Sequence, residues 1–219
     1  MRTSMAQLLP IAVALALVWS RRPWRLLRPI VTIAHEGGHV LTALLAGRRL
    51  AGVRLHADAS GLTVSRGRSG GPGMVVMLLA GYLTPCLLGL AAAVLVDADQ
   101  HQLILAVSVA ALAALLVTVR NVFGLVVIVL TGAALVAAGF TAPAWVQRAS
   151  AAVLAWFLLF GGLRSIGDLR RSRRRTRTRA SDADQLARLT RVPAAVWIGV
   201  FVLAAGGAIV AAAALLVAA

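Results

Sequence analysis

The sequence of 219 residues contains no lysine, one cysteine and one glutamate. The lone cysteine, Cys86, excludes an internal disulfide and any zinc site built from several thiolates. The missing lysine makes arginine the only strongly basic side chain, a bias typical of GC-rich bacterial genomes. Acidic residues are also scarce: seven Asp and Glu stand against 22 arginines, which gives a formal net charge of +15.

Long stretches of the chain lack charge altogether. Residues are 60% hydrophobic and the mean hydropathy is +0.89. Because apolar runs of about 18 residues or more can cross a bilayer, we predict an all-α polytopic membrane protein in which residues 1–219 form a single domain. About seven transmembrane helices are expected, at residues 4–20, 29–47, 73–96, 102–119, 121–140, 144–168 and 193–218.

The connection between the second and third of these spans predicts a β-hairpin. Val53 and Leu55 precede the turn-forming sequence Asp-Ala-Ser-Gly, Leu62 and Val64 follow it, and polar residues alternate with them. An exposed strand edge near Leu62 and Val64 could bind an unwound substrate segment as an extra strand. The alternative is a plain surface hairpin with no role in binding.

The arginines cluster in the connections between apolar spans. Ten of them lie in residues 164–191. Counting positive charges on alternate sides gives 17 arginines against 5 when the N-terminus is cytoplasmic. We therefore predict an integral, multi-pass protein of a bacterial inner membrane with a cytoplasmic N-terminus. The arginine-rich loop is expected to bind anionic lipid headgroups rather than nucleic acid.

The sequence Val-Thr-Ile-Ala-His-Glu-Gly-Gly-His-Val-Leu places His35, Glu36 and His39 within an apolar run. Histidines four residues apart lie one helical turn apart on one face, so both can bind one zinc ion. Glu36, the sole glutamate, would then stand beside a metal-bound water as general base. A charged group there costs about 2.5–3.5 kcal/mol on insertion scales, which favours a functional role. The alternative is that the histidines only hydrogen-bond neighbouring helices.

Three stretches together resemble the site-2 protease family: "AHEGGHVLTALLAG", the hairpin, and "LAGYLTP". The similarity is greatest to the compact bacterial branch without a PDZ domain, and it extends to "RNVFGL" and "SDADQLARLTRVP". This resemblance implies a zinc-dependent membrane metalloendopeptidase. Such an enzyme would use Zn²⁺, a metal-activated water and Glu36 to cleave transmembrane protein substrates within or beside the bilayer.

The family takes its third zinc ligand from an aspartate on a later helix, often within an N-P-D-G or L-D-G stretch that this sequence lacks. Asp168, at the cytoplasmic end of the sixth span, is the first candidate for this ligand, and Asp182 is the alternative. Asp168 could instead pair with an arginine on a neighbouring turn of its own helix. Asp184 fits a capping box with Ser181.

Two further polar residues and one rival function complete the expectations. Asn121 could line the substrate site or cap a helix, and Tyr82 could donate to an oxyanion or serve packing alone.

The rival is a non-proteolytic membrane scaffold or regulatory binding protein that keeps the protease fold. It is favoured by the missing N-P-D-G stretch and by Gly37 and Gly38, because each glycine weakens a helix by about 1 kcal/mol relative to alanine.

Overall fold

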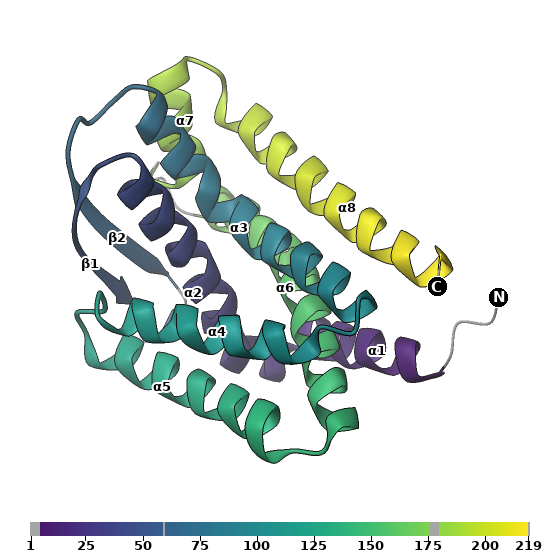
Figure 1. Cartoon of the computed structure of the whole chain (residues 1–219). Coiled ribbons are helices and arrows are strands. Elements are labelled where there is room, and N and C mark those ends of the chain that lie inside the picture. Colours follow the sequence, from purple (N-terminus) through teal and green to yellow (C-terminus); the bar gives the residue numbers. More distant parts are fainter. Residues whose placement is uncertain (1–4, 59, 176–179, 219) are drawn as a thin grey trace.

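The structure, a computed structural model, describes residues 5–58, 60–175 and 180–218. It is helical with one antiparallel hairpin after the second helix, so the predicted fold class is confirmed (Figure 1). The elements in chain order are α1 (Met5–Trp19), α2 (Arg21–Leu45), β1 (Arg49–Leu55), β2 (Gly61–Arg66), α3 (Pro72–Asp97), α4 (His101–Leu116), α5 (Val122–Val136), the π-helical turn η1 (Ala137–Thr141), α6 (Ala144–Arg175), α7 (Asp182–Thr190) and α8 (Ala194–Ala218).

Four stretches of described helix are long and apolar enough to cross a bilayer: α3, α5 with η1, α6 and α8 from Ala194 to Leu216. The apolar helices Leu8–Trp19 and α4 are shorter. The second predicted span is present as α2, but arginines in its first turns and the His-Glu motif make it amphipathic rather than uniformly apolar. The segment that runs from α2 through the hairpin to α3 is therefore the part of the fold that departs most from a plain helical bundle.

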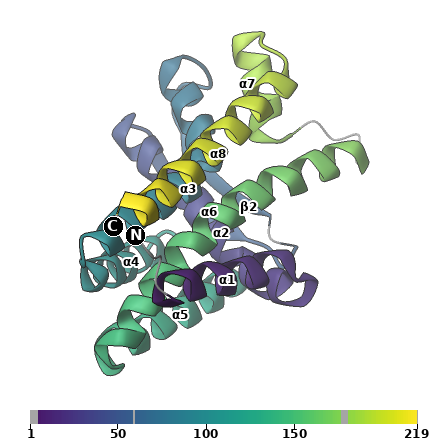
Figure 2. The ribbon, with the colours of Figure 1, turned by 90° about the vertical axis from the view of Figure 1, so that its right-hand side faces the viewer.

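Helix α6 forms the centre of the molecule. Its residues Ala151, Leu159 and Ile166 are fully buried, and α1, α3 and α8 pack around it (Figure 2). Small residues let the helix backbones approach closely, as is common between helices in lipid. A Cβ at Gly89 of α3, for example, would lie 2.8 Å from the Ala155 carbonyl oxygen of α6. This packing fixes α3, on which α2 packs, against α6.

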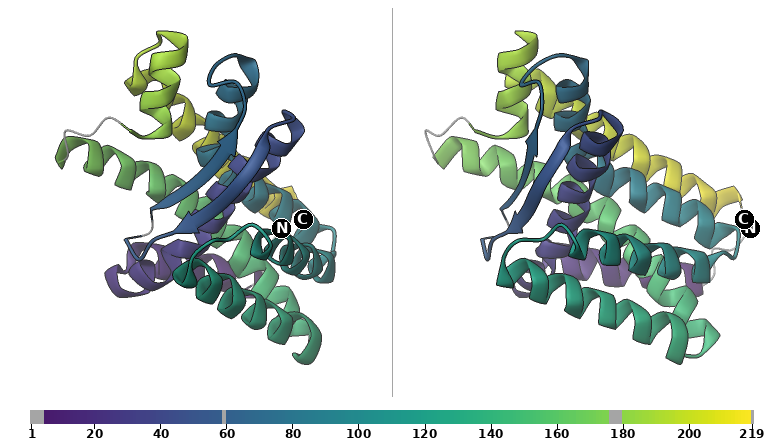
Figure 3. Two further views of the ribbon diagram at one scale, coloured as in Figure 1. Left: turned by 90° about the vertical axis from the view of Figure 1, so that its left-hand side faces the viewer. Right: turned by 60° about the vertical axis from the view of Figure 1, so that its left-hand side comes forward.

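The hairpin has one covered edge. The Val53 N–H of β1 donates to Thr118 O at 2.9 Å, and the Arg120 N–H donates to Val53 O at 2.9 Å. Val53 and its register partner Thr63 of β2 are thus a pair without mutual hydrogen bonds, so the main-chain groups of Thr63 point away from β1. Among the described residues no further strand pairs with β2. The far edge of β2 is therefore the open edge of the sheet (Figure 3).

The arrangement of the helix ends differs from the predicted topology. The beginning of α1 and the end of α8 lie at the same end of the molecule, whereas seven predicted crossings would put the two ends of the chain on opposite sides of the bilayer (Figures 1 and 3). In addition, Trp24 Nε1 at the start of α2 donates to Asp168 Oδ2 of α6 at 3.2 Å. With a cytoplasmic N-terminus, the charge count puts residues 21–28 outside and the end of the sixth predicted span inside, and this contact contradicts that step. The cytoplasmic N-terminus stays a prediction.

Candidate metal centre

Helix α2 places two imidazoles side by side. The Nε2 atoms of His35 and His39 are 3.1 Å apart, as the four-residue spacing on one helix face predicts. The His39 side chain is 7% exposed and that of His35 is 18% exposed. Both nitrogens are therefore shielded from bulk water and directed at a common point.

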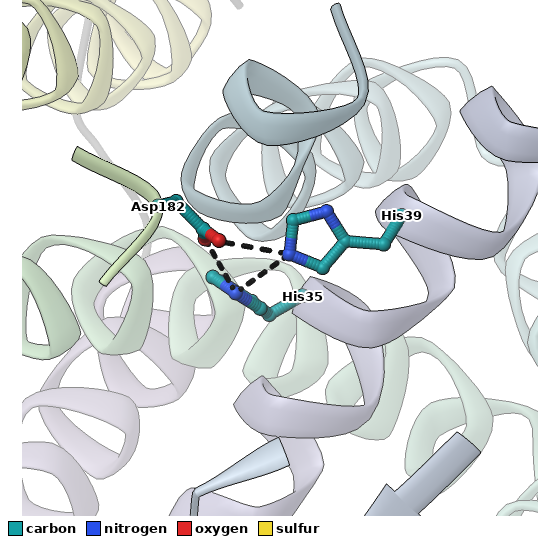
Figure 4. A group of neighbouring side chains, drawn as sticks. All are labelled: His35, His39 and Asp182. Atoms are coloured by element: carbon teal, nitrogen blue, oxygen red, sulfur yellow. Dashed lines mark hydrogen bonds and ion pairs between the residues drawn. The ribbon is translucent and has the colours of Figure 1, made fainter. Parts of the chain in front are cut away.

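Asp182, the first residue of α7, completes a triangle with these nitrogens (Figure 4). Its Oδ2 atom lies 3.1 Å from His35 Nε2 and 3.3 Å from His39 Nε2. Burial raises the pKa of the Asp182 carboxyl, but hydrogen bonds and charge from the two histidines in their protonated form outweigh it and hold the pKa well below its usual range. The carboxylate is therefore ionised, as a metal ligand must be.

The spacing of the three atoms fits a zinc ion. Tetrahedral ligands at the usual Zn–N and Zn–O distances of about 2.0–2.1 Å are roughly 3.3–3.4 Å apart, and the observed separations are 3.1–3.3 Å. His39 Nδ1 lies 2.7 Å from Met77 O, so a proton on Nδ1 donates to this carbonyl; once Nε2 is deprotonated, this tautomer leaves Nε2 available to a metal. Two neutral imidazoles and one carboxylate are also donors that zinc accepts.

Asp168, the first candidate of the sequence analysis for the third ligand, is engaged elsewhere. One carboxylate oxygen accepts the hydrogen bond from Trp24, and the other pairs with Arg171 on the next turn of α6. The pairing within its own helix is the alternative that the sequence allowed. The structure thus brings Asp182, and not Asp168, to the two histidines.

Glu36 lies between the histidines and the hairpin. It is 3% exposed, and its Oε2 atom accepts a hydrogen bond of 2.6 Å from Thr63 Oγ1 of β2. A Cβ at Gly61, on the same strand face, would overlap the Glu36 carboxylate. The sequence analysis did not identify Thr63 or Gly61, although strand alternation places both on the face opposite Leu62.

The three predicted substrate-binding residues have different surroundings. Leu62 and Val64 are 52% and 43% exposed. Asn121 instead binds the hairpin: its Nδ2 donates to Leu55 O at 2.6 Å and its Oδ1 accepts from Leu55 N at 3.1 Å. Its side chain makes no capping hydrogen bond to α5. Asn121 therefore extends the covered edge of β1.

Helix α3 closes the centre from the other side. A Cβ at Gly81 would lie 2.7 Å from atoms of both imidazoles, so only glycine fits there without displacement. The Tyr82 ring packs edge-on against His35 with ring centroids 4.7 Å apart and stacks on Phe201 of α8 at 5.0 Å. The described contacts of Tyr82 are thus packing contacts that support His35.

A cavity of about 810 Å³ opens onto these groups. Its size is within the range of protein ligand sites. Its walls include both histidines, Glu36, Asp182 and residues 60–63 at the start of β2. The cavity therefore connects the candidate metal ligands with the open edge of the hairpin.

Comparison with known proteins gives one match. A family model described as Peptidase M50B-like matches residues 8–212, a range that contains α2, the hairpin and α7. No curated protein and no solved structure matches the chain.

Proposed function

Because the chain belongs to the Peptidase M50B-like family, we propose that it is a zinc-dependent membrane metalloendopeptidase that hydrolyses peptide bonds of membrane-embedded proteins. The membership confirms the resemblance to the site-2 protease family found in the sequence. The observation that carries the proposal is the triangle of His35, His39 and Asp182 beside a buried glutamate.

In this proposal His35, His39 and Asp182 hold the ion and leave one coordination position open. A zinc ion bound there would lower the pKa of a bound water and polarise the scissile carbonyl. Glu36 accepts the proton of the attacking water and then returns it to the leaving amine. Thr63 donates its hydroxyl hydrogen to the Glu36 carboxylate and so orients it.

The open edge of β2 suggests how a substrate is held. The main-chain groups of Thr63 and Gly61 point to this edge, and the side-chain face of the same residues contacts Glu36. A substrate segment that pairs there is extended, which exposes peptide bonds that a helix would shield. The exposed side chains of Leu62 and Val64 then contact alternate substrate side chains on the other face of the sheet.

The membrane environment belongs to the same proposal. The protein is expected to cross a bacterial inner membrane several times, with the arginine-rich end of α6 at anionic headgroups. The side chains of Arg170, Arg171, Arg174 and Arg175 are exposed there. Arg177 and Arg179 of the same run lie outside the described residues.

Gly38 and the missing N-P-D-G stretch, which both favoured the non-proteolytic scaffold, have another explanation in this fold. A Cβ at Gly38 would lie 2.8 Å from Thr84 Cβ and 2.9 Å from Ala80 O, so the glycine permits close packing of α2 on α3. The missing N-P-D-G stretch leaves the third ligand to Asp182 on α7. Neither feature therefore argues against catalysis.

The test compares the wild type with Glu36→Gln in detergent or proteoliposomes. Zinc content and cleavage of single-span membrane peptides are measured on the same preparations. We expect zinc in both proteins and a loss of cleavage in Glu36→Gln of about 10²–10⁴-fold, the usual contribution of a general base. Asp97→Asn, which neutralises an exposed carboxylate at the end of α3, is the control and should cleave like the wild type. A wild type without zinc contradicts the proposal, and zinc without Glu36-dependent cleavage favours the scaffold.

A further inference from the structure

Asp182, the third candidate ligand, lies on a short helix. Helix α7 has nine residues, and Asp182 is its first. Leu186 and Ala183 anchor the helix by apolar burial. Apolar contacts are non-directional, so they do not by themselves fix where the first turn of α7 places a carboxylate.

Polar contacts on both sides of Asp182 supply that direction. The Ser181 N–H donates to Asp184 Oδ2 at 3.2 Å, and the Ser181 hydroxyl donates to the same oxygen. The Asp184 N–H in turn donates to Ser181 Oγ at 3.3 Å. This capping box encloses Asp182 between its two members and makes the backbone of the first turn rigid.

The capping box is tied to α6 by one arginine. Arg173 Nη1 lies 2.8 Å from Asp184 Oδ1, and the two side chains are 15% and 5% exposed. The other described arginines at this end of α6, which are Arg170, Arg171, Arg174 and Arg175, are exposed. Arg173 therefore differs from its neighbours: it supplies the counter-charge of a buried carboxylate, and that carboxylate is destabilised if its partner is removed.

We propose that Arg173 is a positioning residue of the metal centre. Helix α6 is held in the core, and through Arg173 and Asp184 it fixes the start of α7 at the distance where Asp182 meets His35 and His39. Arg173 touches neither the ion nor the substrate in this role. The inference rests on the proposed function, because it takes His35, His39 and Asp182 as the ligand set.

The expected consequence is a selective loss of metal affinity. Without Arg173 the carboxylate of Asp184 turns toward water, the first turn of α7 shifts, and Asp182 moves away from two histidines that stay in place on α2. Outer partners of metal ligands typically contribute 10–100-fold to affinity, so Arg173→Gln should weaken zinc binding by about that factor. Arg173→Lys, which keeps the charge, should recover most of the loss.

The experiment uses the full chain in detergent. Zinc affinity is measured by chelator competition, and the visible absorption of the cobalt-substituted protein reports the coordination geometry. Arg174→Gln is the control: the residue is an exposed neighbour of Arg173 and the change removes the same charge. We expect a weaker, altered cobalt spectrum in Arg173→Gln, a restored one in Arg173→Lys, and the wild-type spectrum and zinc affinity in Arg174→Gln.

Asp182→Ala separates this inference from the proposed function. If Asp182→Ala loses zinc affinity and Arg173→Gln does not, Arg173 is no positioning residue and the ligand set stands. If Asp182→Ala keeps wild-type affinity, the ligand set itself is wrong and the inference fails with it. Should Arg173→Gln not fold, Asp184→Asn decides, because the asparagine side-chain oxygen can still accept the hydrogen bond from the Ser181 N–H but carries no charge. Wild-type zinc affinity in that variant overturns the inference.

Discussion

The two halves of the candidate metal centre are built in different ways. His35 and His39 lie on α2, a helix of 25 residues, and their relative position follows from a spacing of four. Asp182 lies on α7, a helix of nine residues that packs on α3 and α8 and is tied to α6 by the ion pair of Arg173 and Asp184. The α2 half is thus set by local helix geometry, and the α7 half by tertiary structure.

This difference determines how each half should respond to substitution. A change on α2 that leaves the helix intact keeps the two imidazoles paired, because the backbone alone places them. A change near α7 can displace Asp182 without altering either histidine. Variants that affect only the two histidines, or only Asp182, therefore test whether the first half is set by local helix geometry and the second by tertiary structure.

The largest effect is expected from removal of the ligand on α7. Asp182→Ala should lower zinc affinity by more than about 100-fold, because a direct ligand contributes more than the 10–100-fold typical of outer partners. Asp168→Ala should leave the affinity near that of the wild type, since the Asp168 carboxylate binds Trp24 and Arg171. Chelator competition on both variants measures the difference. The opposite order would restore Asp168 as the third ligand.

A smaller but still large effect is expected on the α2 half from a single methyl group. Gly81→Ala places a Cβ 2.7 Å from both imidazoles. The histidines must shift, and we expect zinc affinity to fall by about 10–100-fold, with overpacking costing about 1–3 kcal/mol of stability. The measurements are zinc affinity and thermal unfolding.

Gly206→Ala in α8 is the matched control for this change, because a Cβ there has no neighbour within 4 Å. It should bind zinc like the wild type. Equal zinc affinity in Gly81→Ala and Gly206→Ala would show that the imidazoles can shift without loss of zinc affinity. It would also show that α3 does not constrain the positions of His35 and His39.

The same contrast explains what the sequence could predict. The helical fold, the hairpin and the residues His35, Glu36 and His39 follow from apolar run lengths, strand alternation and one spacing, all of which are local. The choice between Asp168 and Asp182 depends on how α7 packs on α3 and α8, and that packing brings Asp182 to histidines that precede it by about 145 positions. Asp168 was ranked above Asp182 because it lies at the end of the sixth predicted span. That position carries no information on how α7 packs.

The predicted alternation of segments between the two sides of the bilayer was wrong for a related reason. The charge count assumed that each apolar run crosses the bilayer alone and antiparallel to the next. The contact between Trp24 and Asp168 joins segments that this assumption separated. Thr63 and Gly61 were missed because the hairpin was judged by its exposed apolar residues, whereas the opposite face of β2 is the one that meets Glu36.

The third prediction concerns the link between the hairpin and α2. Thr63→Val removes the hydrogen bond to Glu36 at nearly constant shape, and hydrogen bonds to charged groups are worth about 1.5–3 kcal/mol. We expect kcat for peptide cleavage to fall about tenfold or more, with zinc content unchanged. Thr63→Ser retains the hydroxyl and should stay close to the wild type. Equal loss in both variants would point to strand packing rather than to the hydrogen bond.

The smallest effect is expected at the covered edge of the sheet, on β1. Asn121→Ala removes both hydrogen bonds to the Leu55 main chain, each worth about 0.5–1.5 kcal/mol, and so loosens β1 and with it the open edge of β2. Because this edge would bind the substrate while Glu36 and the metal ligands lie on α2 and α7, KM should rise several-fold with little change in kcat or zinc affinity.

Steady-state cleavage of a membrane peptide measures this split between KM and kcat. Gln102→Ala, which removes an exposed amide paired with Gln147 at the start of α4, is the control and should change neither constant. A fall in kcat at constant KM would instead mean that Asn121 acts on Glu36 through β2 and Thr63. In that case the covered edge of the hairpin belongs, like α7, to the tertiary contacts that place catalytic groups, and the comparison between the two halves extends to the general base.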